Sequence, residues 1–204
     1  MFLGPNWRPG DIQYADLNGD GKIDKGNNTL EDPGDQRIIA YEAPRYNFGV
    51  TGIVGWKGFT VNAFFQGVLK YDYWPPNGNW VAFYPFNAGH VENYYLTDTW
   101  SPENPDAYFA APHISTNTKQ NIEPQTRYVQ DAAYIRLRNL TVSYNLPIEL
   151  ISKVGLSDGQ IYFSGMNMWE FTKMRKPLDP EVRPTLTQEY YKQRIYSLGL
   201  RVSF

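Results

Sequence analysis

The sequence contains no cysteine, and no apolar run in it reaches the roughly 18 residues that a membrane-spanning helix needs. The absence of cysteine excludes disulfide bonds and thiolate metal sites. The absence of a long apolar run excludes transmembrane helices, but barrels that span membranes also average polar because half of each strand faces water. The net charge of -2 provides no basic surface for nucleic acid, so no nucleic-acid partner is expected.

Residues that favour helices are also scarce, except near 147–154, whereas aromatic residues make up 16% of the 204 residues. Tyrosine, phenylalanine and tryptophan fit the pleated, half-buried surface of a sheet. The composition therefore predicts an all-β chain, and its length fits one domain of ordinary size.

Five segments alternate apolar and polar residues in the manner of β-strands. They span 46–56, 59–69, 134–146, 160–171 and 194–204. Only Lys57 and Gly58 separate the first two segments, which predicts a long hairpin with a tight turn. The apolar phase slips near Asn139, which predicts a β-bulge, and residues 147–158 predict a short, partly helical connection.

One face of the predicted hairpin and of the last strand is apolar, whereas the two faces of 160–171 are similarly apolar and are left unassigned. In a membrane barrel the apolar face would contact lipid through Phe48, Val50, Val61, Ala63, Leu198 and Leu200. The opposite phase would then line the lumen with Asn47, Thr51, Asn62, Gln66 and Arg201. The alternative is a soluble, secreted, calcium-stabilised β-sandwich for carbohydrate binding or adhesion, in which a second sheet would bury the same apolar face.

Long segments and short links alternate along the chain. The segments 1–45, 70–133 and 172–193 are long and without sustained periodicity, whereas 56–58 and 147–158 are short. Short turns on one side, long loops on the other and a final aromatic residue, Phe204, are typical of bacterial outer-membrane barrels. We therefore expect an antiparallel transmembrane β-barrel portion. Residues 1–45 would form an extracellular loop, and 46–204 would hold the barrel strands with their long loops.

Residues 16–24 read Asp-Leu-Asn-Gly-Asp-Gly-Lys-Ile-Asp, a pattern typical of EF-hand-type calcium loops. The oxygen ligands would be the side chains of Asp16, Asn18, Asp20 and Asp24 and the backbone carbonyl of Lys22. Ca²⁺ takes about six to eight such ligands, and a glycine after the third ligand allows the sharp turn. Because the flanking sequence is not helical, we expect Ca²⁺ to stiffen a long external loop rather than to act in sensing.

The pattern leaves the ligand that closes the calcium loop open. Position 12 is Asn27, where an EF-hand has a bidentate glutamate. The candidates are Asn27, Glu31, Asp32 and Asp35, and Asp35 is favoured because it precedes the apolar exit at Ile38 and Ile39. The alternative for the whole stretch is a solvated turn rich in Asp, Asn and Gly.

Aromatic side chains in the long loops are the candidate ligand contacts. They are Trp74, Trp80, Tyr84 and Trp100, which would stack on sugar rings or hold a lid protein. The alternative is that they pack the loops against themselves.

Catalysis is not expected from this sequence. His90 and His113 are isolated in loops, and Glu103 and Asp106 lie in a stretch whose Pro and Asn residues predict a turn. No nucleophile motif accompanies them.

Ten motifs follow one another in order along nearly the whole chain. They are residues 10–24, Gly34-Asp-Gln-Arg-Ile-Ile39, Pro44-Arg-Tyr-Asn-Phe-Gly49, Lys57-Gly-Phe59, Phe64-Phe-Gln-Gly67, Trp100-Ser-Pro-Glu-Asn-Pro105, Tyr134-Ile-Arg-Leu-Arg-Asn-Leu140, Tyr144-Asn-Leu-Pro147, Gly165-Met-Asn-Met168 and Leu178-Asp-Pro-Glu181. In order and spacing they resemble the late region of SusC/RagA-type TonB-linked (TonB-dependent) outer-membrane transporters.

The resemblance implies a multi-pass barrel of about 22 strands with a plugged lumen in the bacterial outer membrane. It also implies import of bulky nutrients, either glycans and oligosaccharides or peptides, energised through the TonB complex, with a SusD-like surface lipoprotein as a lid. The family's plug domain and TonB box have no counterpart here, and about five strands cannot close such a barrel. We therefore interpret the chain as a C-terminal fragment that would not transport anything alone.

Overall fold

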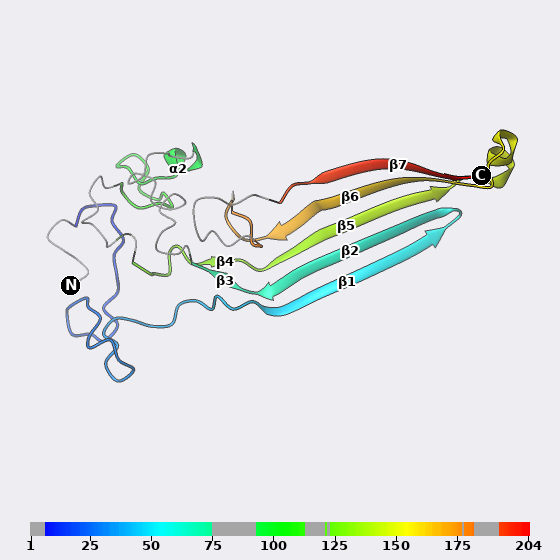
Figure 1. Ribbon diagram of the computed structural model, residues 1–204. Coiled ribbons are helices and arrows are strands. Elements are labelled where there is room, and N and C mark those ends of the chain that lie inside the picture. Colours follow the sequence, from blue (N-terminus) through cyan, green and yellow to red (C-terminus); the bar gives the residue numbers. More distant parts are fainter. Residues whose placement is uncertain (1–6, 75–92, 113–120, 122, 177, 182–191) are drawn as a thin grey trace. The chain divides into compact units, whose positions relative to one another are not determined.

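The computed structural model describes residues 7–74, 93–112, 121, 123–176, 178–181 and 192–204 (Figure 1). These residues form two compact units, which are treated separately. The strand unit comprises the described residues among 41–73, 130–183 and 190–204, and the loop unit comprises those among 1–40 and 74–129.

The strand unit is built on one antiparallel sheet of five strands in the order β1-β2-β5-β6-β7. The strands are β1 (Arg45–Trp56), β2 (Phe59–Lys70), β5 (Tyr134–Asn145), β6 (Asp158–Thr172) and β7 (Ile195–Ser203). All five predicted strands are confirmed, and each boundary lies within two residues of its predicted place.

The β1–β2 hairpin turns on Lys57 and Gly58 alone, as predicted. Both residues have positive φ angles, +46° and +85°, and Trp56 pairs directly with Phe59. Two-residue turns with two positive φ angles match the right-handed twist of the flanking strands. The turn therefore fixes the hairpin's register, which places Val54 opposite Val61 on one face.

The predicted bulge is also confirmed, because Arg138 has no partner in either ladder of β5. The register shifts between Leu137 and Asn139 against β6, and the facing shift on β2 lies between Phe64 and Phe65. The extra residue reverses the alternation. As a result, Leu137 and Leu140 share the apolar face although three positions separate them.

Strand registers place apolar side chains on one face of the sheet, and most polar side chains on the other, which also carries Ile53, Phe64 and Tyr162. The apolar face contains Phe48, Val50, Val54, Val61, Ala63, Phe65, Leu140, Val142, Ile161, Phe163, Leu198 and Leu200. The polar face contains Asn47, Thr51, Asn62, Gln66, Thr141, Ser143, Gln160 and Arg201. The division predicted for the hairpin and the last strand is therefore found, and the registers assign the faces of β6, which the sequence left open.

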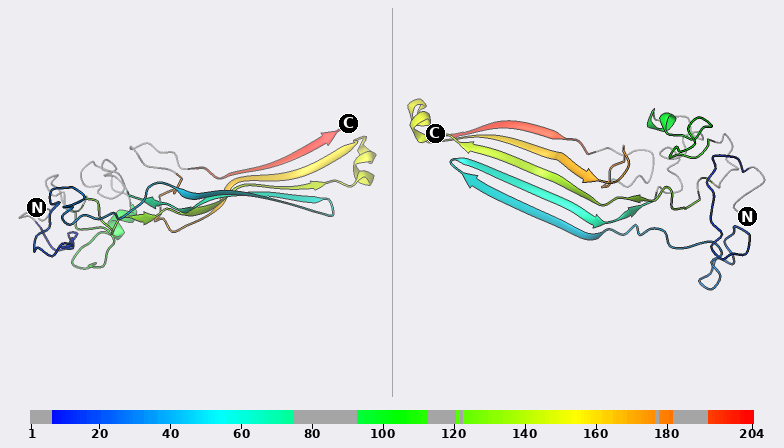
Figure 2. Two further views of the ribbon diagram at one scale, coloured as in Figure 1. Left: turned by 90° about the horizontal axis from the view of Figure 1, so that it is seen from below. Right: turned by 180° about the vertical axis from the view of Figure 1, so that it is seen from behind.

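The five-stranded sheet is a single layer (Figure 2). Val50 is 56% exposed and Leu198 is 79% exposed on the apolar face. Among the described residues, the only other sheet is the pair β3 (Asp72–Tyr73) and β4 (Gln130–Asp131), which is two residues long. A sandwich would need a second sheet over Val50 and Leu198, so the arrangement favours the barrel.

A small core lies where the strands β2 and β5 leave the large sheet. Val68, Tyr71, Tyr73, Ala132, Tyr134 and Met174 are buried together, and Leu178 packs against them. The short pair β3–β4 lies in this region, and the helix α2 (Asn93–Thr97) belongs to the loop unit. These three short elements fall within 70–133, which the sequence predicted to be a loop. The prediction missed them because elements of two to five residues are too short to show a period.

The link between β5 and β6 is short and partly helical, as predicted. It contains α3 (Ile148–Ile151) and the 3-10 turn η3 (Ser152–Val154), and Gly155 ends it in the left-handed conformation. Ile151 is buried and lies close to Gly159 at the start of β6. No helix in the described residues is long and apolar enough to cross a membrane.

Two distant segments of the loop unit are joined by hydrogen bonds around Asn121, which is 1% exposed. Its side-chain oxygen accepts from the Ile12 amide at 2.8 Å, and its amide nitrogen donates to the Asp11 carboxylate at 2.8 Å. The Ala111 amide donates to the Gly10 carbonyl at 2.8 Å. Since Asn121 satisfies both segments with one buried side chain, it fixes residues 10–12 against 110–111.

Candidate functional site

The predicted calcium loop is ordered by its own acidic side chains. The two carboxylate oxygens of Asp16 accept from the amides of Gly19 at 2.6 Å and Gly21 at 2.8 Å. The Asn18 side-chain oxygen accepts from the Asp20 amide at 3.0 Å, and Asp20 accepts from the Lys22 amide at 2.8 Å. Both glycines have positive φ angles, so residues 16–22 form the sharp turn that the pattern predicts.

Of the four candidates for the ligand that closes the calcium loop, Asp35 is the one that contacts the loop in the fold. Its two carboxylate oxygens accept from the Leu17 amide at 2.6 Å and the Asp24 amide at 2.9 Å, and its own amide donates to the Asp24 carbonyl. These amides from Asp24 and Leu17 lower the pKa of Asp35. Asp32, by contrast, accepts from the Asn27 backbone and side chain in a separate turn.

The donor set of this loop fits calcium by its chemistry. Asp16, Asp20, Asp24 and Asp35 supply carboxylates, which are the hard oxygen ligands that Ca²⁺ prefers. A carboxylate oxygen that accepts one N–H keeps a second lone pair for an ion. In the part of the chain that the structure describes, however, no three histidine, aspartate or glutamate side chains gather closely enough to hold a metal ion. The calcium site therefore stays a prediction.

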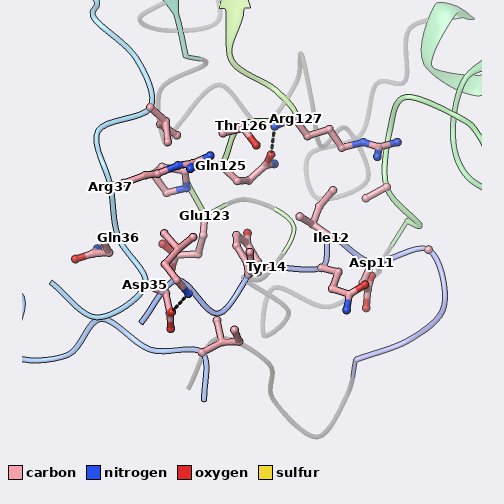
Figure 3. A pocket seen from close by; sticks show the side chains of 18 of the residues that line it. Asp11, Ile12, Tyr14, Asp35, Gln36, Arg37, Glu123, Gln125, Thr126 and Arg127 are labelled. Atoms are coloured by element: carbon pink, nitrogen blue, oxygen red, sulfur yellow. Dashed lines mark hydrogen bonds between the residues drawn. The ribbon is translucent and has the colours of Figure 1, made fainter. Parts of the chain in front are cut away.

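A cavity of about 760 Å³ lies in the loop unit beside this loop (Figure 3). One wall comes from the calcium loop and its closing segment, through Leu17, Ile23, Lys25, Asp35 and Arg37. The other walls come from residues 10–15 and from the later segments, through Trp100, Phe109, Glu123, Gln125 and Arg127. The volume is in the range of small-molecule sites.

Tyr14 and Glu123 are far apart in the sequence but both line this cavity (Figure 3). Burial and, to a lesser extent, the Glu123 carboxylate and Tyr128 raise the pKa of Tyr14, so its hydroxyl stays protonated. Glu123 also accepts from the Lys25 ammonium at 3.3 Å. This ion pair links Lys25, which directly follows the calcium loop, to the later segment that contains Glu123.

Of the two predicted aromatic residues that the structure describes, Trp74 and Trp100, Trp100 lines the cavity. A Cβ atom at residue 10 would lie 2.3 Å from its ring, so only glycine, here with φ of +90°, allows the ring to lie against the backbone. Trp74 is half-buried and does not line the cavity. Trp80 and Tyr84 lie outside the described residues, and so do His90 and His113.

The other acidic pair considered from the sequence lies in a turn. Ser101 and Asn104 form an isolated bridge, and Glu103 and Asp106 lie in the turn around it. Neither side chain lines the cavity.

The polar face of the strand unit carries a buried cluster of charges that sequence reasoning missed. The Arg136 side chain on β5 is 4% exposed, and its guanidinium donates to Glu170 on β6 and, at 2.8 Å, to Asp179. Glu181, also 4% exposed, lies 3.0 Å from Arg136 and accepts from Arg138 at 3.0 Å. Lys192 donates to the same Glu181 carboxylate.

This cluster attaches the segment Leu178–Glu181 to the polar face of the sheet. Burial alone would raise the pKa of Glu181, but the hydrogen bond from Lys192 and the charges of Arg136 and Arg138 outweigh it and lower the pKa. Three cations face three carboxylates, so the cluster is neutral overall. Its sequence signals were two arginines on the polar phase of β5 and the Asp-Pro-Glu that follows β6.

No protein-family model matches the chain. Two curated relatives from Formosa agariphila are named as TonB-dependent receptors. Receptor P3 is 29% identical over 164 residues, which cover 80% of this chain and 15% of the relative. Receptor P26 is 27% identical over 208 aligned residues, which cover 96% of this chain and 20% of the relative. The chain therefore spans a fifth or less of the curated relatives that it matches.

Solved structures of the RagAB peptide importer share the fold. In its open-open state the TM-score is 0.57 at 22% identity, over 82% of this chain and 18% of the other. In its closed-closed state the TM-score is 0.58 at 22% identity, over 91% of this chain and 20% of the other. The predicted fold, an antiparallel sheet that forms part of a barrel, and the resemblance to SusC/RagA-type TonB-dependent transporters are thereby confirmed.

Proposed function

We propose that the chain is the C-terminal barrel portion of a TonB-dependent importer in the bacterial outer membrane. The observation that carries this proposal is the apolar face of the five-stranded sheet, which has no second layer over Val50 or Leu198 in the described residues. A lipid-facing surface is the arrangement in which such side chains are stable without a covering sheet. The relatives' names, TonB-dependent receptor and peptide importer, support transport rather than catalysis.

We further propose that the full-length protein imports bulky nutrients together with a SusD-like surface lipoprotein, and that a part outside this chain contacts the TonB complex. The solved neighbours import peptides, which favours a peptide substrate. Glycans remain the second candidate, since the names of the curated relatives state no substrate.

Fractionation of the producing cell tests the location. We expect the full-length protein in the outer-membrane fraction, soluble only in detergent, and we expect its deletion to abolish growth on the imported nutrient. A protein that is secreted and soluble without detergent would contradict the importer and favour the calcium-stabilised sandwich.

Ca²⁺ is proposed as a structural ion in the loop of residues 16–24, closed by Asp35. Asp16, Asp20 and Asp24 would hold the ion together with Asp35, and the ion would stiffen the cavity wall that this loop forms. It would supply rigidity and no chemistry.

Chelation tests the calcium proposal on the full-length protein. We expect EGTA to increase the rate at which trypsin cuts after Lys22 and Lys25, and we expect Asp16→Asn to have the same effect without chelator. Asp106→Asn, which changes an exposed carboxylate elsewhere in the loop unit, is the matched control. Equal cutting with and without calcium would contradict the proposal.

A further inference from the structure

The link between β5 and β6 leaves three large apolar side chains exposed. Ile148 is 55% exposed, Leu150 is 59% exposed and Val154 is 71% exposed. Exposed apolar side chains scattered singly need no explanation, but a group of them on one short element marks a surface that contacts something other than water. The link therefore has an apolar partner to find.

Hydrogen bonds hold this link in one shape. The Leu150 amide donates to the Pro147 carbonyl at 3.0 Å, and Gly155, with φ of +76°, ends the helical part. The residues that follow are joined to the end of β7, where the Ser157 amide donates to the Ser203 carbonyl at 2.9 Å. The exposed side chains are therefore presented by a defined turn that is attached to the sheet.

The link packs onto the apolar face of the sheet. Gly159 pairs with Val202, which lies on the same face as Leu200. A Cβ atom at residue 159 would lie 3.3 Å from the Ile151 side chain and 3.2 Å from that of Leu146. Since paired residues point to the same face, the buried Ile151 side chain lies on the apolar side of the sheet. The link is thus continuous with the face that is proposed to contact lipid.

Helical spacing separates the apolar side chains of the link from its charged ones. Ile148 and Val154 lie three positions before and after Ile151, on the same side of a turn of about 3.6 residues. Glu149 and Lys153 lie two positions before and after it, on the opposite side, and both are exposed. Because these two charges cancel, attraction to charged headgroups would add little to binding.

Aromatic side chains mark this end of the sheet as the boundary between lipid and water. Trp56 pairs with Phe59, and Phe59 pairs with Tyr144, their ring centroids 4.4 Å apart. These side chains lie on the apolar face at the end of the sheet where the link follows β5 (Figure 1). Aromatic rings gather at the headgroup level of membrane barrels. The link follows this aromatic row directly, at the level where amphipathic elements bind a membrane surface.

We propose that residues 147–156 form an interfacial anchor, in which Ile148, Leu150 and Val154 insert between the headgroups and the acyl chains of phospholipids. Glu149 and Lys153 then lie in the headgroup layer. The inference rests on the proposed barrel, because a sheet that contacts lipid is what brings this link to a bilayer. The anchor extends the lipid-contacting surface beyond the strands and fixes the depth of this rim in the membrane.

Spin labels on the full-length protein in phosphatidylcholine vesicles test the anchor. The labelling sites are Leu150→Cys and Val154→Cys, and Glu149→Cys on the opposite side of the same turn is the matched control. We expect the labels at 150 and 154 to meet a water-soluble nickel chelate, relative to lipid-soluble oxygen, about threefold less often than the label at 149, because apolar faces of interfacial elements lie about 5–10 Å below the headgroups. Phosphatidylcholine carries no net charge, so shielding in these vesicles is due to apolar insertion.

A charge placed among the exposed side chains tests the cause of this shielding. Val154→Asp should raise the nickel access of the label at residue 150 to that of the label at residue 149, because a carboxylate lifts the turn out of the boundary. Val154→Ile, which keeps the side chain apolar, should leave the nickel access unchanged.

A label at residue 50, on the apolar face of β1, separates the failure of the anchor from the failure of the barrel. If that label lies in lipid while the label at residue 150 is as open to nickel as the one at 149, the anchor is overturned and the importer stands. Shielding of residue 150 from both reagents would mean that protein covers the link, which also overturns the proposal. A label at residue 50 outside lipid would overturn the barrel and the anchor together.

Discussion

Replacement of Arg136 by methionine should release the segment Leu178–Glu181 from the polar face of the sheet. Arg136 is 4% exposed and contacts Glu170, Asp179 and Glu181 at once. Removing one member of a buried ion cluster costs about 3–5 kcal/mol, because the remaining charges lose their partner without regaining water.

The lower end of that range applies to this cluster. Glu170 is 24% exposed and regains water readily, and Glu181 keeps Arg138 and Lys192. A loss of about 3 kcal/mol raises the population of the detached segment by about 100-fold, at about 1.4 kcal/mol per factor of ten.

Trypsin cleavage of the full-length protein measures this population, since cutting follows the open fraction when closing is fast. The sites are Lys173 and Arg175, which precede the attached segment. Arg201→Met is the control, because Arg201 is 66% exposed and lies 3.9 Å from Asp158, so its ion pair contributes little. Arg136→Lys should fall in between, since one ammonium replaces a planar fork.

A cleavage rate for Arg136→Met within about threefold of the unchanged protein would refute this reasoning, because about 3 kcal/mol of lost stabilisation predicts a much larger change. The same rise in the Arg201→Met control would assign the effect to a general loosening of the sheet rather than to the cluster.

Three further results are expected. Glu181→Gln should lower the stability of the protein by a constant amount above pH 4.5, and this loss should shrink as the pH falls below 4.5. The reason is that the pKa of Glu181 in the folded protein is lowered from its usual value of 4.5. Thermal melting temperatures of both proteins, measured as a function of pH, test this expectation. Gly10→Ala should destabilise the loop unit by more than the roughly 1 kcal/mol of strain expected for Gly155→Ala, where a Cβ meets open space; proteolysis of each variant compares them. Leu198→Lys should reduce assembly into membranes at a cost of about 2–4 kcal/mol, whereas Ser197→Lys on the polar face should be tolerated, as scored by the amount of folded protein in the outer membrane.

The strands were predictable because each is nine residues or longer and most keep one alternation, with β5 changing phase once at its bulge. The alternation in β1 and β2 is set by burial of one face, and Lys57-Gly58 leaves room for one kind of turn only. Even the bulge left a signal, since Arg138 shifts the apolar phase by one position. Local patterns that a chain must satisfy residue by residue can be read without knowing the partner strand.

The calcium loop was predictable only in its local part. The turn of residues 16–22 follows from short-range hydrogen bonds between Asp16, Asn18, Asp20 and the amides that follow them. Asp35 was favoured over three other candidates, and the fold brings it to Leu17 and Asp24. Whether an ion completes this set stays a prediction.

The buried charge cluster and the cavity could not be predicted from local patterns. Arg136 and Asp179 are 43 positions apart, and Asn121 is 110 positions from Asp11, so no periodicity links them. Single arginines on the polar phase of a strand look the same whether they face water or a carboxylate. Only the return of a loop onto the sheet decides between these two environments.

Spin labels on the sheet test the central claim, that lipid wets its apolar face, most directly. The chain has no cysteine, so Val50→Cys and Thr51→Cys each add a single labelling site to it, on opposite faces of β1. In outer-membrane vesicles, the label at residue 50 should be relaxed by lipid-soluble oxygen and shielded from a water-soluble nickel chelate, and the label at residue 51 should not show this pattern. Shielding of the label at residue 50 from both reagents would mean that protein covers this face, and the barrel would be wrong.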